Sequence, residues 1–86
     1  MKAKKEITEL ESVVNRFKIK LDKLQIEIDN RQEKFDNHSE KWQESEKGED
    51  FNLKISELQY LHYEIEDKIE AIEFAVQELI ELLDND

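Results

Sequence analysis

Two uninterrupted heptad tracks constrain this chain more than any other feature of its sequence. On both tracks apolar residues recur at alternating steps of three and four. The tracks consist of Ile7, Leu10, Val14, Phe17, Leu21, Leu24, Ile28, Arg31, Phe35, His38 and Trp42, and then of Phe51, Ile55, Leu58, His62, Ile65, Ile69, Ile72, Val76, Leu79 and Leu83. All but three of these positions are apolar, although only 37% of the chain is hydrophobic. This spacing is typical of coiled-coil helices, so the sequence predicts an all-α fold and not a disordered chain.

The two tracks are out of phase, and the mismatch falls near the single glycine. Residues 39–50 contain a near-repeat, SEKWQE and then SEKGED, and Gly48 stands in its second half. Glycine readily adopts the left-handed conformation that closes a helix. We therefore predict a turn at 48–49, with Lys47 in the last turn of the first helix and Asp50 as the N-cap of the second. The expected helices span about 6–47 and 50–83, within a single domain of residues 1–86.

Two alternatives concern the first helix. Thr8 and Glu11 have the spacing of a capping box, so the helix could begin there. The poor helix formers at 36–39 offer a weaker break, but the track stays in phase through them. We interpret that segment as continuous helix.

A short connection predicts that the two helices pack as an antiparallel α-helical hairpin. The predicted cross-helix pairs are Trp42–Ile55, Ile28–Ile69 and Phe17–Leu79. Further apolar residues flank the seam, and a lone hairpin would leave them in water. We therefore expect a homodimer that forms a four-helix bundle, anchored around Val13, Ile80 and Leu82.

Three polar residues interrupt the tracks: Arg31, His38 and His62. The predicted register brings the two histidines near one another, as a metal site or a pH switch would require. A Zn²⁺ site needs three or four ligands, and only carboxylates remain to complete it. We favour a polar layer that fixes the register, with Arg31 paired to a carboxylate such as Glu27 or Glu66. The sequence predicts no metal site and no cofactor.

Candidate catalytic groups are scarce. The chain has no cysteine, and one glycine is too few for a glycine-rich phosphate loop. No Asp or Glu occupies a track position, so the carboxylates are expected on open faces, where nothing shifts their pKa for acid–base work. The sequence predicts a protein that is not an enzyme and has no catalytic residue.

The charge is distributed unevenly. The net charge is −10, with a balance of +1 over residues 1–43 and −11 over residues 44–86. An acidic surface repels nucleic acid and anionic membranes and favours basic proteins. No apolar run approaches the roughly 20 residues that cross a bilayer, and the N-terminus does not resemble a signal peptide, so we expect a cytoplasmic protein. The predicted partner-binding residues are Glu57, Glu64, Asp67, Glu70, Glu78, Glu81, Tyr60, Tyr63 and Phe74.

Three functional hypotheses follow from these features. The first is a small acidic inhibitor or adaptor that binds a basic protein surface. The second is a structural or scaffolding coiled-coil dimer. The third is a mimic of DNA, because acids seven residues apart on a helix repeat every ~10.5 Å, and the intervening acids bring the spacing nearer to the ~7 Å between phosphates along one strand.

The segment RQEKFDNHSEKWQESEKGE, residues 31–49, resembles segments of small uncharacterised proteins from bacteria and their phages. The resemblance implies no known activity and assigns no functional residue. An association with phages would favour an inhibitor of a host or defence protein.

Overall fold

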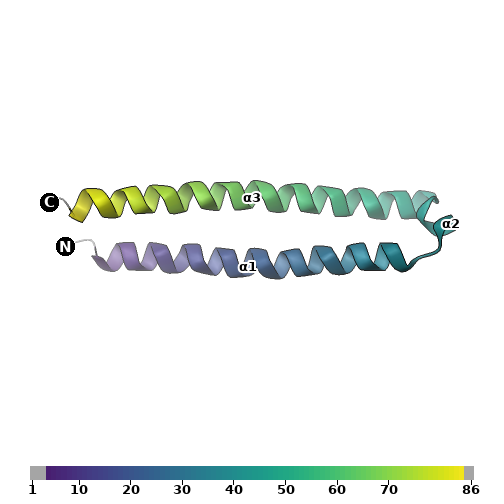
Figure 1. The fold of residues 1–86 in the computed structure, drawn as a ribbon, viewed down its shortest axis with the longest axis horizontal. Helices are drawn as coiled ribbons and strands as arrows, with labels where there is room; N and C mark the ends of the chain where they lie inside the picture. Colours follow the sequence, from purple (N-terminus) through teal and green to yellow (C-terminus); the bar gives the residue numbers. More distant parts are fainter. Residues whose placement is uncertain (1–3, 85–86) are drawn as a thin grey trace.

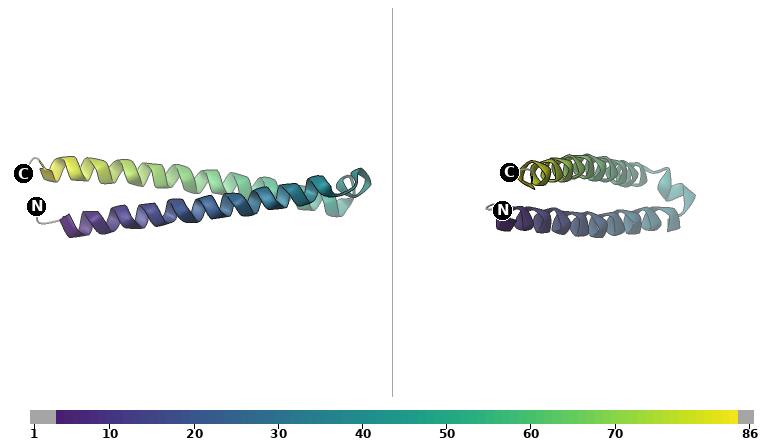
Figure 2. Two further views of the ribbon diagram at one scale, coloured as in Figure 1. Left: turned by 60° about the horizontal axis from the view of Figure 1, so that its bottom comes forward. Right: turned by 60° about the vertical axis from the view of Figure 1, so that its left-hand side comes forward.

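The computed structural model describes residues 4–84, which form three helices and no strand. The helices are α1 (Lys4–Asn37), α2 (Glu40–Gln43) and α3 (Glu46–Asp84). The long helices α1 and α3 lie side by side, with the start of α1 and the end of α3 at one end of the rod and α2 at the other (Figures 1 and 2). The rod measures 65 × 15 × 12 Å. The all-α prediction is confirmed.

The chain reverses earlier than the sequence predicted. Helix α1 ends at Asn37, within the run of poor helix formers, and α3 already begins at Glu46. Lys47, Gly48 and Asp50 therefore lie inside α3, and Gly48 has no positive φ. The predicted turn at 48–49 and the continuous helix through 36–39 are wrong. The alternative helix start at Thr8 is also wrong, because α1 begins at Lys4.

Two serine caps produce the reversal. Ser39 precedes α2, and its Oγ accepts a hydrogen bond of 3.2 Å from the backbone N–H of Trp42. Ser45 precedes α3, and its Oγ accepts a bond of the same length from the N–H of Gly48. In each case a side-chain oxygen satisfies a free N–H of the first helical turn. The near-repeat in residues 39–50 is therefore a pair of successive helix starts.

Gly48 is required for a reason other than its conformation. A Cβ atom at this position would lie 2.1 Å from the carbonyl oxygen of Trp42 and 2.7 Å from that of Gln43. The first turn of α3 thus passes directly against the backbone of α2, and only a residue without a side chain fits. The sequence predicted correctly that glycine is needed at position 48, but it predicted a left-handed turn there, which the structure does not have.

Side chains from α2 close the end of α1. The Nε2 of Gln43 donates to the carbonyl oxygens of Phe35, at 2.9 Å, and of His38, at 3.1 Å. The carbonyl oxygen of Phe35 also accepts from the backbone N–H of His38 at 3.1 Å, so Gln43 adds a donor where the helical hydrogen bonds of α1 run out. Trp42 stacks on His38 at 3.7 Å between ring centres and meets the edge of Phe51 at 5.9 Å.

The register of α1 against α3 differs from the predicted one. Ile28 lines the same groove as Ile55, whereas Ile69 packs with Val14 and Leu21. The predicted pair Ile28–Ile69 is therefore wrong, and Trp42 meets Phe51, one helical turn before its predicted partner Ile55. Because the reversal comes several residues early, the residue of α3 that shares a groove with Ile28 is Ile55, which lies closer to the reversal than Ile69.

The core is a single column on each helix. The buried residues recur at every seventh position, and they are Ile7, Val14, Leu21 and Ile28 in α1 and Gly48, Ile55, His62, Ile69 and Val76 in α3. The other members of each track are far more open: Phe17 and Ile72 are both 51% exposed. Each long helix thus buries four residues of its predicted track.

Candidate interaction surfaces

The two long sides of the helix pair differ in chemistry. On one side, four residues after a buried position, Lys18 pairs with Glu73, and Gln25 and Gln59 exchange two hydrogen bonds of 2.9 Å. We call this the polar side. Three and six residues after the buried positions, the opposite side carries mainly apolar residues from both helices.

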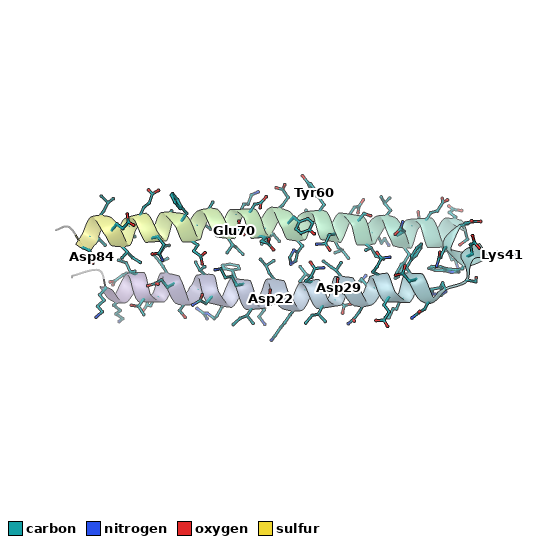
Figure 3. The ribbon with its side chains drawn as sticks, in the orientation of Figure 1. Asp22, Asp29, Lys41, Tyr60, Glu70 and Asp84 are labelled. Atoms are coloured by element: carbon teal, nitrogen blue, oxygen red, sulfur yellow. The ribbon has the colours of Figure 1, made fainter. Side chains whose placement is uncertain are left out.

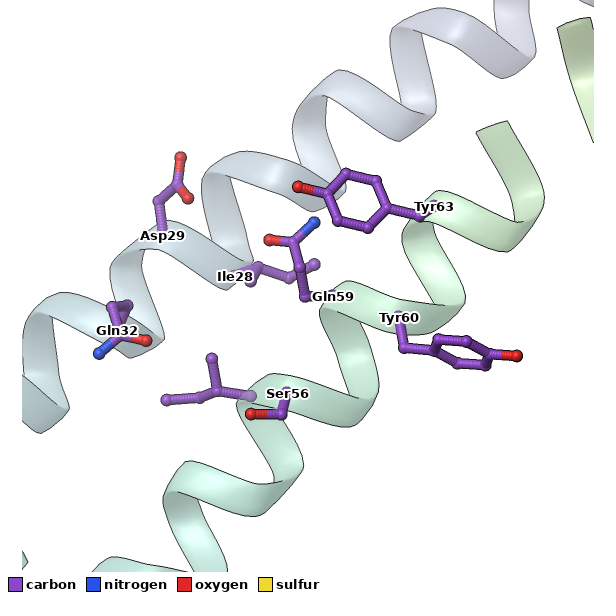
Figure 4. Close-up of a pocket in the computed structure, with 8 residues that line it drawn as sticks. Ile28, Asp29, Gln32, Ser56, Gln59, Tyr60 and Tyr63 are labelled. Atoms are coloured by element: carbon purple, nitrogen blue, oxygen red, sulfur yellow. The ribbon is translucent and has the colours of Figure 1, made fainter. Parts of the chain in front are cut away.

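The polar side contains a shallow groove (Figure 4). Its volume is about 480 Å³, and its lining residues are Ile28, Asp29, Gln32, Ile55, Ser56, Gln59, Tyr60 and Tyr63. Tyr63 leans towards α1, whereas Tyr60 points away from it (Figure 4). The groove offers amide hydrogen bonds over an isoleucine floor, but it is open to solvent along its length.

The opposite side forms an apolar strip. Its members are Leu10, Val13, Phe17, Leu61, Ile65, Ile72, Leu79 and Leu82, which are 37–69% exposed. They come from both helices, near the start of α1 and from the middle to the end of α3. An exposed apolar surface of this extent marks an interaction site in most soluble proteins.

The outward side of α3, which faces away from α1, forms an acidic face. It comprises the positions one, two and five residues after the buried column, with the same seven-residue repeat continued to both ends of the helix. Within Glu46–Asp84 these positions carry ten carboxylates and no lysine or arginine, namely Glu46, Glu49, Asp50, Glu57, Glu64, Asp67, Glu70, Glu78, Glu81 and Asp84. The same face exposes Leu53, Tyr60 and Phe74 by 57–67%. Figure 3 shows Tyr60 pointing away from α1.

The predicted partner-binding residues share this face. All nine occupy its positions, and Tyr63, one residue after His62, stands at its edge and leans over the groove on the polar side. Glu64 stands at its edge and pairs with Lys68 at 3.1 Å. Heptad spacing alone did not reveal that the three lysines of α3 all lie outside this face.

The polar seam residues do not form a cluster. His62 is 4% exposed, and its Nε2–H donates to the carbonyl oxygen of Leu21 at 3.0 Å. Its Nδ1 has no hydrogen-bond partner among the described residues, and the nearest carboxylate oxygen, of Glu66, is 4.0 Å away. His38 is exposed at the reversal, so the predicted approach of the two histidines is wrong. Because His62 packs against α1 backbone, it occupies a core position and is not part of an accessible site.

Arg31 is half-buried, and its Nε lies 3.3 Å from Glu27, one of the two carboxylates that the sequence offered. Within residues 4–84, no group of three or more histidine and carboxylate side chains is arranged to hold a metal ion.

Together these features define the class of the protein broadly: an all-α chain built from one long helix pair, with chemically distinct surfaces. Comparison with protein-family models, curated proteins and solved structures found no match. No helix within the described residues is both long and apolar enough to span a bilayer.

Proposed function

We propose that this chain is a non-enzymatic protein–protein interaction module, a small acidic inhibitor or adaptor that binds a basic protein surface. The observation that carries the proposal is the segregation of charge on α3, whose outward face holds ten carboxylates and no cation. A field of one sign steers an oppositely charged partner into contact and raises the association rate.

The partner surface combines cations with an apolar contact. Leu53, Tyr60 and Phe74 stand among the carboxylates on the acidic face, each more than half exposed. Aromatic side chains contribute strongly when an interface buries them, whereas exposed charges contribute mainly to rate and specificity. The bound surface therefore presents lysine or arginine around an apolar patch.

A charge-reversal experiment with a matched control tests this function. The variant Glu64→Lys, Glu70→Lys, Glu78→Lys alters the acidic face, and Glu9→Lys, Asp22→Lys, Glu33→Lys makes the same change in net charge on exposed positions of α1. Basic proteins captured from a cell extract should be lost from the first variant and retained by the second. Their binding should weaken as salt rises from about 0.05 to 0.5 M. Equal loss from both variants would show that only overall charge matters and would overturn the proposal.

Mimicry of DNA is a second candidate, supported by the column of Glu57, Glu64 and Glu78 on the same face. Ala71 interrupts this column, and the exposed apolar residues interrupt the acidic face, so it resembles a phosphate row less closely than it resembles a mixed protein surface. Under mimicry, duplex DNA would compete with the chain for its captured partner. A partner that binds DNA and the chain simultaneously excludes this candidate.

We also propose that the chain is a homodimer in which two helix pairs form a four-helix bundle. The half-buried seam supports this, because a pair with one buried column per helix leaves much of its apolar surface in water. If the dimer exists and no basic partner is captured, the scaffolding hypothesis becomes the better description.

A further inference from the structure

We infer that the apolar strip is the surface through which two copies associate, that the copies lie with their reversals at the same end, and that their acidic faces point in opposite directions. The inference deepens the proposed dimer by naming its surface and orientation. It does not depend on binding of a basic partner.

The extent of the strip suits association of two copies. Eight large side chains contribute to it, each 37–69% exposed. At about 80–100 Å² for each such side chain, the strip offers roughly 600–800 Å² per copy. A stable interface buries about 800 Å² per partner, so one second copy would cover the strip with an area of the usual size.

The charges along the edges of the strip favour a second copy over a partner of one sign. On α3 the edge column contains all three lysines of the helix, Lys47, Lys54 and Lys68, at multiples of seven residues. On α1 the corresponding column contains Lys20, Lys34 and Glu27. Carboxylates of the acidic face, such as Glu57 and Glu64, lie just beyond the α3 lysines. An edge that carries both positive and negative residues can pair with the same edge of a second copy. A basic partner, in contrast, would be repelled by the lysines.

The distribution of apolar residues determines the orientation. The strip occupies residues 10–17 near the start of α1 and 61–82 from the middle to the end of α3. Towards the reversal the same side carries Arg31, Lys34 and Lys54 among the half-buried Leu24, Phe51 and Leu58. Because the exposed apolar residues are off-centre along the rod, two copies cover each other's strips along their full length only if their reversals lie at the same end.

A two-fold axis along the rod then places α1 of one copy over α3 of the other. This arrangement sets the nearly neutral α1 against the acidic α3 and keeps the two α3 helices at diagonal corners. The opposite orientation would stack α3 on α3 and bring like charges together. In the inferred dimer the acidic faces are therefore free, on opposite sides of the bundle.

Two substitutions on the same helix test the surface. Ile72→Glu adds a carboxylate to the strip, and Phe74→Glu adds one to the acidic face, two residues away, at a site that is more exposed. In sedimentation equilibrium, the unmodified protein and Phe74→Glu should be dimers. Ile72→Glu should raise the dimer dissociation constant at least about 100-fold, because burial would strip its charge of water. A monomeric unmodified protein, or equal effects of the two variants, would overturn the inference.

A spin-label measurement tests the orientation independently of these variants. The chain has no cysteine, so Lys41→Cys in exposed α2 supplies one labelling site per copy. With the reversals at the same end, the two labels lie across the width of a bundle, about 20–30 Å apart. A separation near the 65 Å length of the rod would overturn the orientation while leaving the surface in place. If the protein forms this dimer but binds no basic protein, the proposed function is contradicted and the inferred dimer is not.

Discussion

Replacing Gly48 with alanine should destabilise the protein, although alanine is the better helix former. In an ordinary helical position this change stabilises by about 0.5–1 kcal/mol. Here the new Cβ would lie 2.1 Å from the carbonyl oxygen of Trp42, far inside any normal contact distance, and both groups belong to backbone. Relief requires α2 and the first turn of α3 to separate.

The expected loss follows from three contributions. Overpacking against a well-fitted neighbour costs about 1–3 kcal/mol. The separation also strains the hydrogen bond from the Gly48 N–H to the Ser45 Oγ, a cap that stabilises by about 1 kcal/mol. The higher helix propensity of alanine offsets this loss by about the same amount. The net change is a loss of about 1–3 kcal/mol, which lowers Tm by roughly 5–20 °C for a chain of this size.

Thermal unfolding followed by circular dichroism measures this loss. All samples need the same protein concentration, because association makes Tm depend on concentration. Asn52→Ala, at an exposed position of α3, is the matched control and should raise the stability by a few tenths of a kcal/mol. A Tm for Gly48→Ala equal to or above that of the unmodified protein would refute the close approach of α2 and α3.

Three further predictions concern single contacts. Gln43→Ala should lower the stability by about 1 kcal/mol in urea unfolding, because the carbonyl oxygens of Phe35 and His38 each lose a side-chain donor; an unchanged midpoint would contradict this. A double-mutant cycle on Lys18 and Glu73 should give a coupling below about 1 kcal/mol that fades in high salt, since both side chains are about 40% exposed; a coupling that persists at high salt would be unexpected. His62→Leu should change the stability by less than about 1 kcal/mol, because it removes the unpartnered Nδ1 and keeps the volume, whereas His62→Ala should cost about 2–4 kcal/mol; equal losses would assign the role of His62 to its hydrogen bond to Leu21.

The sequence predicted the sides of the helices better than their ends. Every buried residue of α1, and every buried residue of α3 except Gly48, lies on one of the two heptad tracks, because periodicity records which side of a helix avoids water. Periodicity contains no information on where a helix stops. The track runs in phase through residues 36–39, yet the chain leaves the helix there because Ser39 can cap a new one.

The end signals were present but ambiguous. Ser39 and Ser45 are followed by the same Glu-Lys pair, and recognising both as N-caps would have placed the reversal correctly. The required contact between Gly48 and the backbone of α2 is a tertiary feature that no local pattern contains. The uneven exposure of the tracks is equally non-local, since it depends on the rotation of α1 against α3.

The position of the reversal also dictates the order in which the molecule folds. Contacts beside α2, such as Trp42 on Phe51, join residues close in the chain, whereas Lys18 and Glu73 near the open end are far apart in it. Closing a short loop costs less entropy than closing a long one. The two long helices should therefore pair first beside α2 and then progressively towards the other end of the rod. In the monomer, amide hydrogens should exchange slowest near α2 and fastest at the opposite end, and association with a second copy should slow exchange at that end.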